Sequence, residues 1–442
     1  MKLRKLLAAT AVGVLTLALA APAAAHDEEP PQPPMGEQPA TTPNMHLVGH
    51  VNPGPVTNAD VYGYRRHAYL ASWIGNGCLS TGVRVYDLTD PSHPAHVSTF
   101  ADKVSEPDLV GTWTEKVIVQ RVDTASFHGD VAVVSFQVCN RFNDTAFRGF
   151  GLYDVTDPAH PAALARYSAP GTRGSHELWL GTDAGRAYVY TGILRSEWTS
   201  SPTYDRATNT ATTPGRADFR IVDVTDPRHP ADVGEWGAWK ELGVVPIANP
   251  ANQNSGFQSF THSVRVDRTL STAYLSNWDL GTVFLDIRDP AHPRYLGRTE
   301  PEQGAAHSAV IDPNGKLLIE THETNGGIPM IYDITDLSHP VELSHVHKPG
   351  DAQTSVHDPK LRGSRAYFSW YEHGVVVADI AHPEHPLIVG QFMPDDLVFN
   401  PDFCDFDGGC VEVWGVFVLD NLILASDMNS GLYVVKMTGL TS

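Results

Sequence analysis

One short motif recurs six times along the chain, and it constrains the fold more than any other feature. In each copy an apolar run ends in Asp and leads into a turn rich in Asp, Pro and His, as in VRVYDLTDPSHP (83–94). The Asp residues that end these runs are 67, 69, 63, 47 and 46 residues apart: Asp87, Asp154, Asp223, Asp286, Asp333 and Asp379. A seventh run, GLYVVKMTG (431–439), lacks the turn. A period of this length with so much strand-forming sequence predicts a β-propeller.

Each repeat unit has the pattern of four strands separated by Gly, Pro and Asp, which is clearest at 357–361, 365–370, 374–380 and 386–392. Counting first strands gives seven units, which begin near Asp60, Glu115, His176, His262, His307, His357 and Trp414. The seventh unit has only three strands after Cys410, and residues 46–51 (HLVGHV) match the pattern of a fourth strand. We therefore predict an all-β, seven-bladed propeller over residues 46–442. The N-terminal strand should close it by pairing into the last blade, which removes exposed sheet edges.

The recurring strands resemble those of the LVIVD-repeat proteins. The resemblance is carried by FRIVD (219–223), VFLD (283–286) and MIYD (330–333), and it covers roughly residues 46–438. That family is predicted to form β-propellers and has no agreed catalytic residues. The resemblance therefore implies the fold, and it assigns no activity.

The N-terminus has the pattern of an export signal. Residues 1–25 begin with a basic segment, continue with an apolar stretch and end in three alanines, as in a Sec signal peptide. A membrane anchor is the alternative. Residues 26–45 are acidic and rich in Pro, which predicts a disordered linker. No later segment approaches 18 consecutive apolar residues, so we expect a secreted or extracytoplasmic monomer without a membrane span.

Charge and cysteine content narrow the partners and the compartment. The net charge is −20, from 31 basic and 51 acidic residues, which argues against a nucleic-acid partner because phosphate binding needs a basic field. Export permits disulfides. Cys78 and Cys139 fall in equivalent loops of adjacent blades and are expected to pair. Cys404 and Cys410, which close the loop CDFDGGC, are expected to form a second bridge. Free thiols are the alternative.

The chain has 21 histidines, and four of them share one position in the repeat. Another six lie in the recurring turn and are interpreted as turn residues: His93, His160, His229, His292, His339 and His385. The four begin the first strands of four consecutive blades: His176, His262, His307 and His357. Because first strands surround the propeller axis, these side chains should converge. Neutral imidazoles bind transition metals, so we predict a copper or zinc site at the channel mouth. The alternative is that each His hydrogen-bonds a neighbouring strand or water.

Further candidate residues surround this position. Glu177 and Asp358 directly follow two of the histidines, and they are candidates for supporting a ligand or acting as a base. Strict strand alternation would turn them away from the histidines. Asp60, Glu115 and Trp414 should hold the histidine position in blades 1, 2 and 7. A ligand rim is expected from first-strand starts and from second-to-third-strand loops: Trp278, His322, Glu323, Trp370, His373 and Trp414. The long insertions at 193–216, 237–260 and 393–410 fall on the same face, which is typical of a binding face.

Two functions remain open from the sequence. The favoured one is a binding or interaction module whose ligand, a small molecule or an extracellular protein, sits at the channel mouth. The other is a metal-dependent oxidoreductase or hydrolase, with copper among the metals considered, that uses the histidine cluster. The chain contains no phosphate-binding loop, H-E-x-x-H helix or G-x-S-x-G elbow. The sequence therefore identifies neither catalytic residues nor a substrate.

Overall fold

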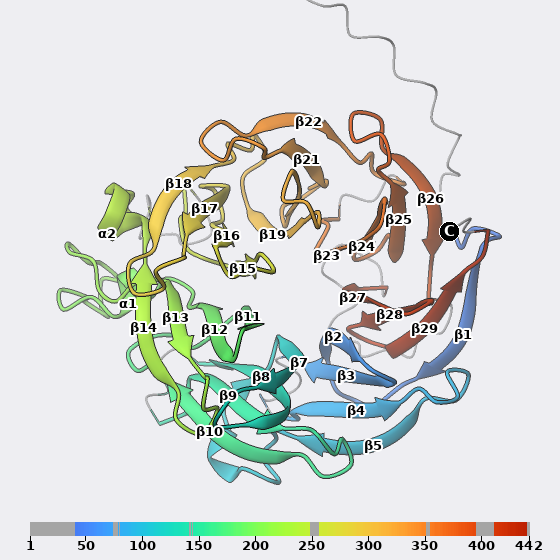
Figure 1. The fold of residues 1–442 in the computed structure, drawn as a ribbon, viewed down its shortest axis with the longest axis horizontal. Coiled ribbons are helices and arrows are strands. Elements are labelled where there is room, and N and C mark those ends of the chain that lie inside the picture. Colours follow the sequence, from blue (N-terminus) through green and yellow to red (C-terminus); the bar gives the residue numbers. More distant parts are fainter. Residues whose placement is uncertain are drawn as a thin grey trace, which may run out of the picture. The chain divides into compact units, whose positions relative to one another are not determined.

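The protein folds into seven four-stranded antiparallel blades arranged as a β-propeller, as predicted (Figure 1). A computed structural model describes residues 40–73, 78, 80–140, 143, 145–247, 256–350, 354–394 and 411–439. The predicted signal peptide, most of the linker, and Cys404 and Cys410 lie outside the described residues. Helix is confined to η1 (Pro107–Leu109), α1 (Ser196–Thr199) and α2 (Ala238–Leu242) within the described ranges. In that part of the chain, no helix is long and apolar enough to cross a membrane.

In blades 1 to 6 the strands follow one another in sequence from the axis outward (Figure 1). Blades 1 and 2 contain β2 (Asn58–Tyr64), β3 (His67–Ser72), β4 (Val83–Asp87), β5 (Ala95–Phe100), then β7 (Val117–Asp123), β8 (His128–Val138), β9 (Gly149–Asp154) and β10 (Ala162–Ser168). A short strand, β6 (Thr112–Trp113), also pairs with β8. Blades 3 and 4 contain β11 (Leu178–Asp183), β12 (Arg186–Gly192), β13 (Phe219–Asp223), β14 (Ala231–Trp236), then β15 (Ser263–Val266), β16 (Thr272–Ser276), β17 (Thr282–Asp286) and β18 (Arg294–Arg298).

Blades 5 and 6 contain β19 (Ala306–Ile311), β20 (Leu317–His322), β21 (Met330–Asp333), β22 (Val341–His345), then β23 (Pro359–Arg362), β24 (Arg365–Ser369), β25 (Val375–Asp379) and β26 (Leu387–Phe392). Blade 7 contains β27 (Val413–Leu419), β28 (Leu422–Asp427) and β29 (Gly431–Met437). Its fourth strand is β1 (Met45–Val51), which pairs antiparallel with β29, with Met45 opposite Met437. The predicted closure by the N-terminus is confirmed.

The chain joins the propeller before the expected end of the linker. The backbone N–H of Thr42 donates to the carbonyl oxygen of Gln391 at 2.9 Å, and the side-chain amide of Asn44 donates to Val389 at 2.8 Å. Both acceptors belong to β26 of blade 6. Residues 41–44 therefore run along this outer strand instead of extending the linker to residue 45.

The recurring turns are built as their sequence suggests. In blade 1 the Asp87 carboxylate accepts the backbone N–H of Thr89 at 2.8 Å, and Asp90 accepts that of Ser92 at 3.1 Å. The Nδ1 of His93 lies 3.2 Å from Asp90 Oδ2, with the His side chain 84% exposed. The same Asp–His contact occurs in blades 2 to 5, at His160, His229, His292 and His339. These histidines stabilise turns on the surface, which leaves the histidines near the axis to be explained.

Candidate metal centre

A β-bulge at the start of the first strand governs what reaches the propeller axis. In blade 5, Ala306 pairs with His322 and Ser308 pairs with Thr321, so His307 is the inserted residue. In blade 3, Gly192 accepts from the N–H of His176 and donates to the carbonyl of Glu177, both at 2.9 Å. A bulge sets two consecutive residues against one partner and interrupts the alternation of side chains. Two residues in a row can therefore face the axis.

Blades 6 and 7 contain the same β-bulge. His357 and Asp358 lie opposite Ser369, and Trp414 is the inserted residue next to the pair of Gly415 and Ser426. In blade 2, Lys116 lies opposite Ser135, so Glu115 takes the histidine position, as expected. Blade 1 differs from the expectation. Its irregularity spans Ala59 and Asp60, so Ala59 corresponds to the histidines and Asp60 to the residue after them.

Seven side-chain rings form a closed circuit around the axis, and we call this the mouth ring. Its members are Trp113, His176, His262, His307, His357, Trp414 and Trp73. Successive ring centroids are 6.1, 4.1, 4.2, 4.1, 4.1 and 5.6 Å apart, and Trp73 closes the circuit to Trp113 at 5.5 Å. The four imidazoles are therefore consecutive neighbours, and the sequence-based expectation that they converge agrees with this placement.

Two of the histidines have one ring nitrogen held by protein groups. His176 Nδ1 lies 2.5 Å from the Glu115 carboxylate, and the side-chain amide of Gln137 also contacts it. His307 Nδ1 donates to the carbonyl oxygen of His357 at 2.9 Å. Contacts of this kind orient an imidazole and leave Nε2 as the metal-binding atom. The Nε2 atoms of His176 and His262 lie 2.7 Å apart.

Other imidazole nitrogens are buried and have no hydrogen-bond partner in the part of the chain that the structure describes: His262 Nδ1, His307 Nε2, His357 Nδ1 and His357 Nε2. Buried polar atoms are nearly always bonded, so this concentration makes the mouth ring the candidate binding site. Glu115, His307 and His357 each offer a ligand atom, and these atoms lie within 4.8 Å of one another. Glu177, His262 and His307 do the same. Donors this close together are candidates for sharing one ion, and His307 belongs to both groups.

Burial keeps part of the cluster neutral. It lowers the pKa of His262 well below the usual value, and the adjacent His176 and His307 lower it further. Burial and the neighbouring His307 likewise lower the pKa of His357. The neutral imidazole is the form that binds metals. The donor set, imidazole with carboxylate, fits zinc, copper, iron or nickel.

An ionic layer lies next to the mouth ring and consists of Asp60, Lys116, Glu177, Arg265, Asp358 and Lys360. Lys116 Nζ lies 3.0 Å from Asp358, 3.3 Å from Asp60 and 3.5 Å from Glu177. Arg265 lies 3.1 Å from Asp358 and 3.5 Å from Glu177, and Lys360 also contacts Asp358. Glu177 and Asp358 face the axis here, because the bulge overrides the alternation that would have turned them away.

The basic residues of this layer determine the charge of Glu177 and Asp358, whereas burial outweighs Lys116 at Asp60 and raises its pKa to about 6. Burial alone would raise the pKa of Glu177, but Lys116 and Arg265 outweigh it and lower the pKa to about 2. Burial would also raise the pKa of Asp358, but the nearby Lys116 and Lys360 outweigh it and lower the pKa well below its usual value. Carboxylates with such low pKa values are weak bases. We therefore assign both residues to holding the ionic layer instead of to proton transfer.

The residues predicted for the rim separate into two groups. Trp278 is half-buried beside His262, with ring centroids 5.2 Å apart, and Glu323 Oε2 lies 3.6 Å from His307 Nε2. Tyr371, which lies in the same loop as the rim candidates Trp370 and His373 but was not among them, donates a hydrogen bond to Glu323. In each of these three blades, one second-strand residue lies opposite the bulge: Ser276, Thr321 or Ser369. Trp278, Glu323 and Tyr371 each follow that residue by two positions. Side chains two positions apart on a strand point to the same side. Counting by two from Ser369 would have identified Tyr371.

The other rim candidates do not reach the mouth. His322 is fully buried, with Nε2 2.8 Å from Glu320 and Nδ1 3.1 Å from the carbonyl oxygen of Ile328. Trp370 belongs to a hydrophobic core cluster, and His373 is fully buried with its ring against that of Trp370. Strand alternation turns His322 and Trp370 into the packing between blades, one position away from the mouth.

The expected link between neighbouring loops is present. Cys78 and Cys139 form a disulfide, with Cα atoms 6.2 Å apart, that joins blades 1 and 2.

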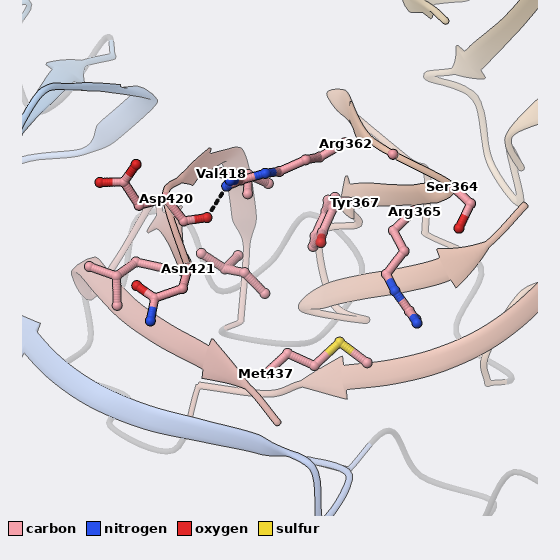
Figure 2. Close-up of a pocket in the computed structure, with 11 residues that line it drawn as sticks. Arg362, Ser364, Arg365, Tyr367, Val418, Asp420, Asn421 and Met437 are labelled. Atoms are coloured by element: carbon pink, nitrogen blue, oxygen red, sulfur yellow. Dashed lines mark hydrogen bonds between the residues drawn. The ribbon is translucent and has the colours of Figure 1, made fainter. Parts of the chain in front are cut away.

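A separate pocket of about 440 Å³ lies at the other end of blades 6 and 7 (Figure 2). It is formed by the β23–β24 and β27–β28 turns, so it opens on the face opposite the first-strand starts. Its arginines already have protein partners: Arg362 donates to the carbonyl oxygen of Asp420, and Arg365 lies 3.8 Å from Asp379. The mouth ring contains buried imidazole nitrogens that have no hydrogen-bond partner among the described residues, so it is the stronger candidate site.

The fold and this cluster define the chain as a seven-bladed β-propeller with a histidine-rich axis. No family model matches the chain, and no curated protein matches it. Among matching solved structures is the crystal structure of the computationally designed Ika8 protein, at 9% sequence identity and a TM-score of 0.49. That match covers 88% of this chain and 99% of the designed chain.

Proposed function

We propose that this protein is an exported binding module that holds a transition-metal ion, zinc or copper, at the mouth of the propeller. His262, His307 and His357 would hold the ion with His176, while Glu115 orients His176 and offers a carboxylate. The observation that carries the proposal is the set of four imidazole nitrogens that are buried at one place without a described partner. The partner presented to this site would be a small molecule or an extracellular protein.

Export is part of the same proposal. It is supported by the signal-peptide pattern of residues 1–25 and by a disulfide between Cys78 and Cys139, which is typical of oxidising compartments. The recurring strands that end in Asp support placing the chain with the LVIVD-repeat proteins.

A metal-dependent hydrolase is the second candidate, and Glu323 is the residue that favours it. Its side chain is 26% exposed and lies 3.6 Å from His307 Nε2, on the open side of the cluster. A metal ion held by the histidines would supply Lewis acidity and lower the pKa of bound water. A carboxylate beside it is suited to accept a proton from that water.

The test is elemental analysis of protein purified after export, compared between the wild type and the double variant His262→Ala/His307→Ala. We expect about one zinc or copper ion per wild-type chain and its loss from the double variant. The matched control is His93→Ala/His339→Ala, which removes two exposed turn histidines and should leave the metal content unchanged. Circular dichroism would establish that each variant is folded. A metal-free wild type that also takes up neither ion on dialysis against Zn²⁺ or Cu²⁺ would refute the proposal.

A further inference from the structure

The mouth ring has two chemically different halves. Blades 3 to 6 contribute the four imidazoles, whereas blades 7, 1 and 2 contribute three indoles: Trp414, Trp73 and Trp113. Tyr371 extends the indole half, with its ring centroid 5.8 Å from that of Trp414. The planes of Tyr371 and Trp414 cross at 88°, and those of Trp73 and Trp113 cross at 73°. Sites that bind quaternary ammonium ligands are walled by aromatic rings, so we call these four rings the aromatic cage.

The charges around this cage are negative. Glu323 accepts a hydrogen bond from Tyr371. Burial raises the pKa of Tyr371 well above its usual value, and the carboxylates of Glu323, Glu412 and Glu115 raise it further. The basic residues of the ionic layer are already in contact with acids, since Lys116, Arg265 and Lys360 all contact Asp358. With these basic side chains already paired, the Glu323 carboxylate beside Tyr371 favours a cation in the cage.

The backbone holds Tyr371 in an unfavourable conformation. Its φ is +32°, in the left-handed region that bulky residues rarely occupy, and Trp278 in blade 4 has φ +45°. The carbonyl oxygen of Tyr371 accepts from Gly374 at 2.9 Å and from Val413 of the next blade at 3.3 Å. Strained residues persist where the surrounding structure fixes them, and they cluster at ligand sites. Here the strain places an aromatic side chain at the mouth in each of two blades.

We propose that Trp73, Trp113, Trp414 and Tyr371 form a subsite for an organic ammonium ion, such as a quaternary amine. The negative faces of the rings attract the cation, and Glu323 and Glu115 add charge complementarity. This subsite uses other side chains than the proposed metal ion and does not require it. Because both ligands are cations on the same ring of side chains, each should weaken binding of the other to an equal degree.

The test is a calorimetric titration of the intact, metal-free protein with choline and with its uncharged isostere 3,3-dimethylbutan-1-ol. The two probes have the same shape and differ in charge. We expect choline to bind at least about tenfold more tightly, the effect of a desolvated cation–π contact. Trp73→Leu should abolish choline binding and Trp73→Phe should retain part of it. The control is Trp239→Leu, which changes an indole on α2 that packs on Trp198.

The metal variants separate this inference from the proposed function. His262→Ala/His307→Ala should lose the metal and still bind choline, whereas Trp73→Leu should keep the metal and lose choline. Equal binding of the two probes would show an apolar subsite and overturn the inference. Absence of choline binding by the folded wild type, or unchanged binding by Trp73→Leu, would also overturn it.

Discussion

Among single residues, Glu115 has a position that no other carboxylate in the described chain reproduces. It holds the histidine position of blade 2, lies 2.5 Å from His176 Nδ1 and offers an oxygen to the group that contains His307 and His357. A carboxylate that accepts the Nδ1 proton fixes the tautomer of a metal-binding histidine and raises its basicity. Glu115 therefore acts on the cluster in two ways, by orienting one imidazole and by supplying negative charge.

The substitution Glu115→Gln should weaken metal binding about 10- to 100-fold, the usual effect of losing such a partner. Gln keeps the volume of the side chain and removes its charge, so the change tests charge and not packing. Competition between the protein and a metal-sensitive dye measures the affinity. Glu241→Gln, on an exposed part of α2, is the control. Equal affinity in wild type and Glu115→Gln would contradict the role that we give to this carboxylate.

The sequence predicted the positions of the four histidines but not the orientation of the side chains next to them. The repeat placed His176, His262, His307 and His357 at one position because each first strand begins with the same pattern. The orientation of Glu177 could not be derived, because a bulge has no sequence signature here and it reverses the alternation. The buried side chain of His322 and the mouth-facing side chain of Glu323 follow from the register of β20, which the sequence does not fix.

At the scale of elements, adjacent blades interlock through the fourth strand and the next turn. A Cβ atom added to Gly234 in β14 would lie 2.0 Å from the carbonyl oxygen of Pro290, and one added to Gly297 in β18 would lie 2.0 Å from that of Leu337. Ser98 and Ser344 instead donate hydrogen bonds to the turns of the next blades, at Pro158 and Pro383. The recurring turn thus supports the neighbouring blade as well as its own.

The substitution Gly234→Val should lower the free energy of unfolding by about 1–3 kcal/mol, because the new side chain forces the turn at Pro290 away from β14. Denaturant unfolding followed by circular dichroism measures the change. Ala231→Val is the control, since Ala231 is an exposed residue of the same strand. If both variants lost the same stability, strand propensity and not the contact between blades would be responsible.

Two insertions are joined by one buried carboxylate. Glu197 of α1 accepts the backbone N–H groups of Trp239 and Lys240 in α2, at 2.9 and 2.8 Å. Burial raises the pKa of Glu197 to about 7. Because the folded pKa lies above the ordinary value of 4.5, protonation stabilises the folded form. That stabilisation is complete below pH 4.5 and is lost as the pH rises through about 7.

The stability difference between wild type and Glu197→Gln should therefore depend on pH. Gln cannot ionise, so the wild type should lose stability relative to the variant as the pH rises from 5 to 8. Thermal unfolding midpoints across this range measure the difference. Glu241→Gln in α2 serves as the control and should show a constant offset. A pH-independent offset for Glu197→Gln would mean that the carboxylate stays ionised when folded.

At the scale of the whole molecule, the ring closes where the repeat is incomplete. Blade 7 ends at β29 without the recurring turn, and its fourth strand comes from the other end of the chain (Figure 1). Gly390 of blade 6 therefore meets no turn. A Cβ atom added there would lie 3.0 Å from the sulfur of Met45 and 3.2 Å from Met437. These methionines fill the place that a turn occupies elsewhere. The sequence predicted this closure because the repeat shows both how many blades there are and what a fourth strand looks like. The last blade lacks a fourth strand, and residues 46–51 match that pattern.

Removal of β1 should leave a propeller that still contains its blades but has an open edge. The register from Met45 opposite Met437 to Val51 opposite Leu432 would be lost, together with the stacking of His50 on Tyr433 at 4.2 Å. An exposed edge strand recruits other chains. We therefore expect a chain that begins at residue 53 to unfold at a lower temperature and to aggregate in light scattering. A chain that begins at residue 40 retains β1 and should match the full-length chain. Equal stability and solubility of the two truncations would show that closure by β1 does not stabilise the ring.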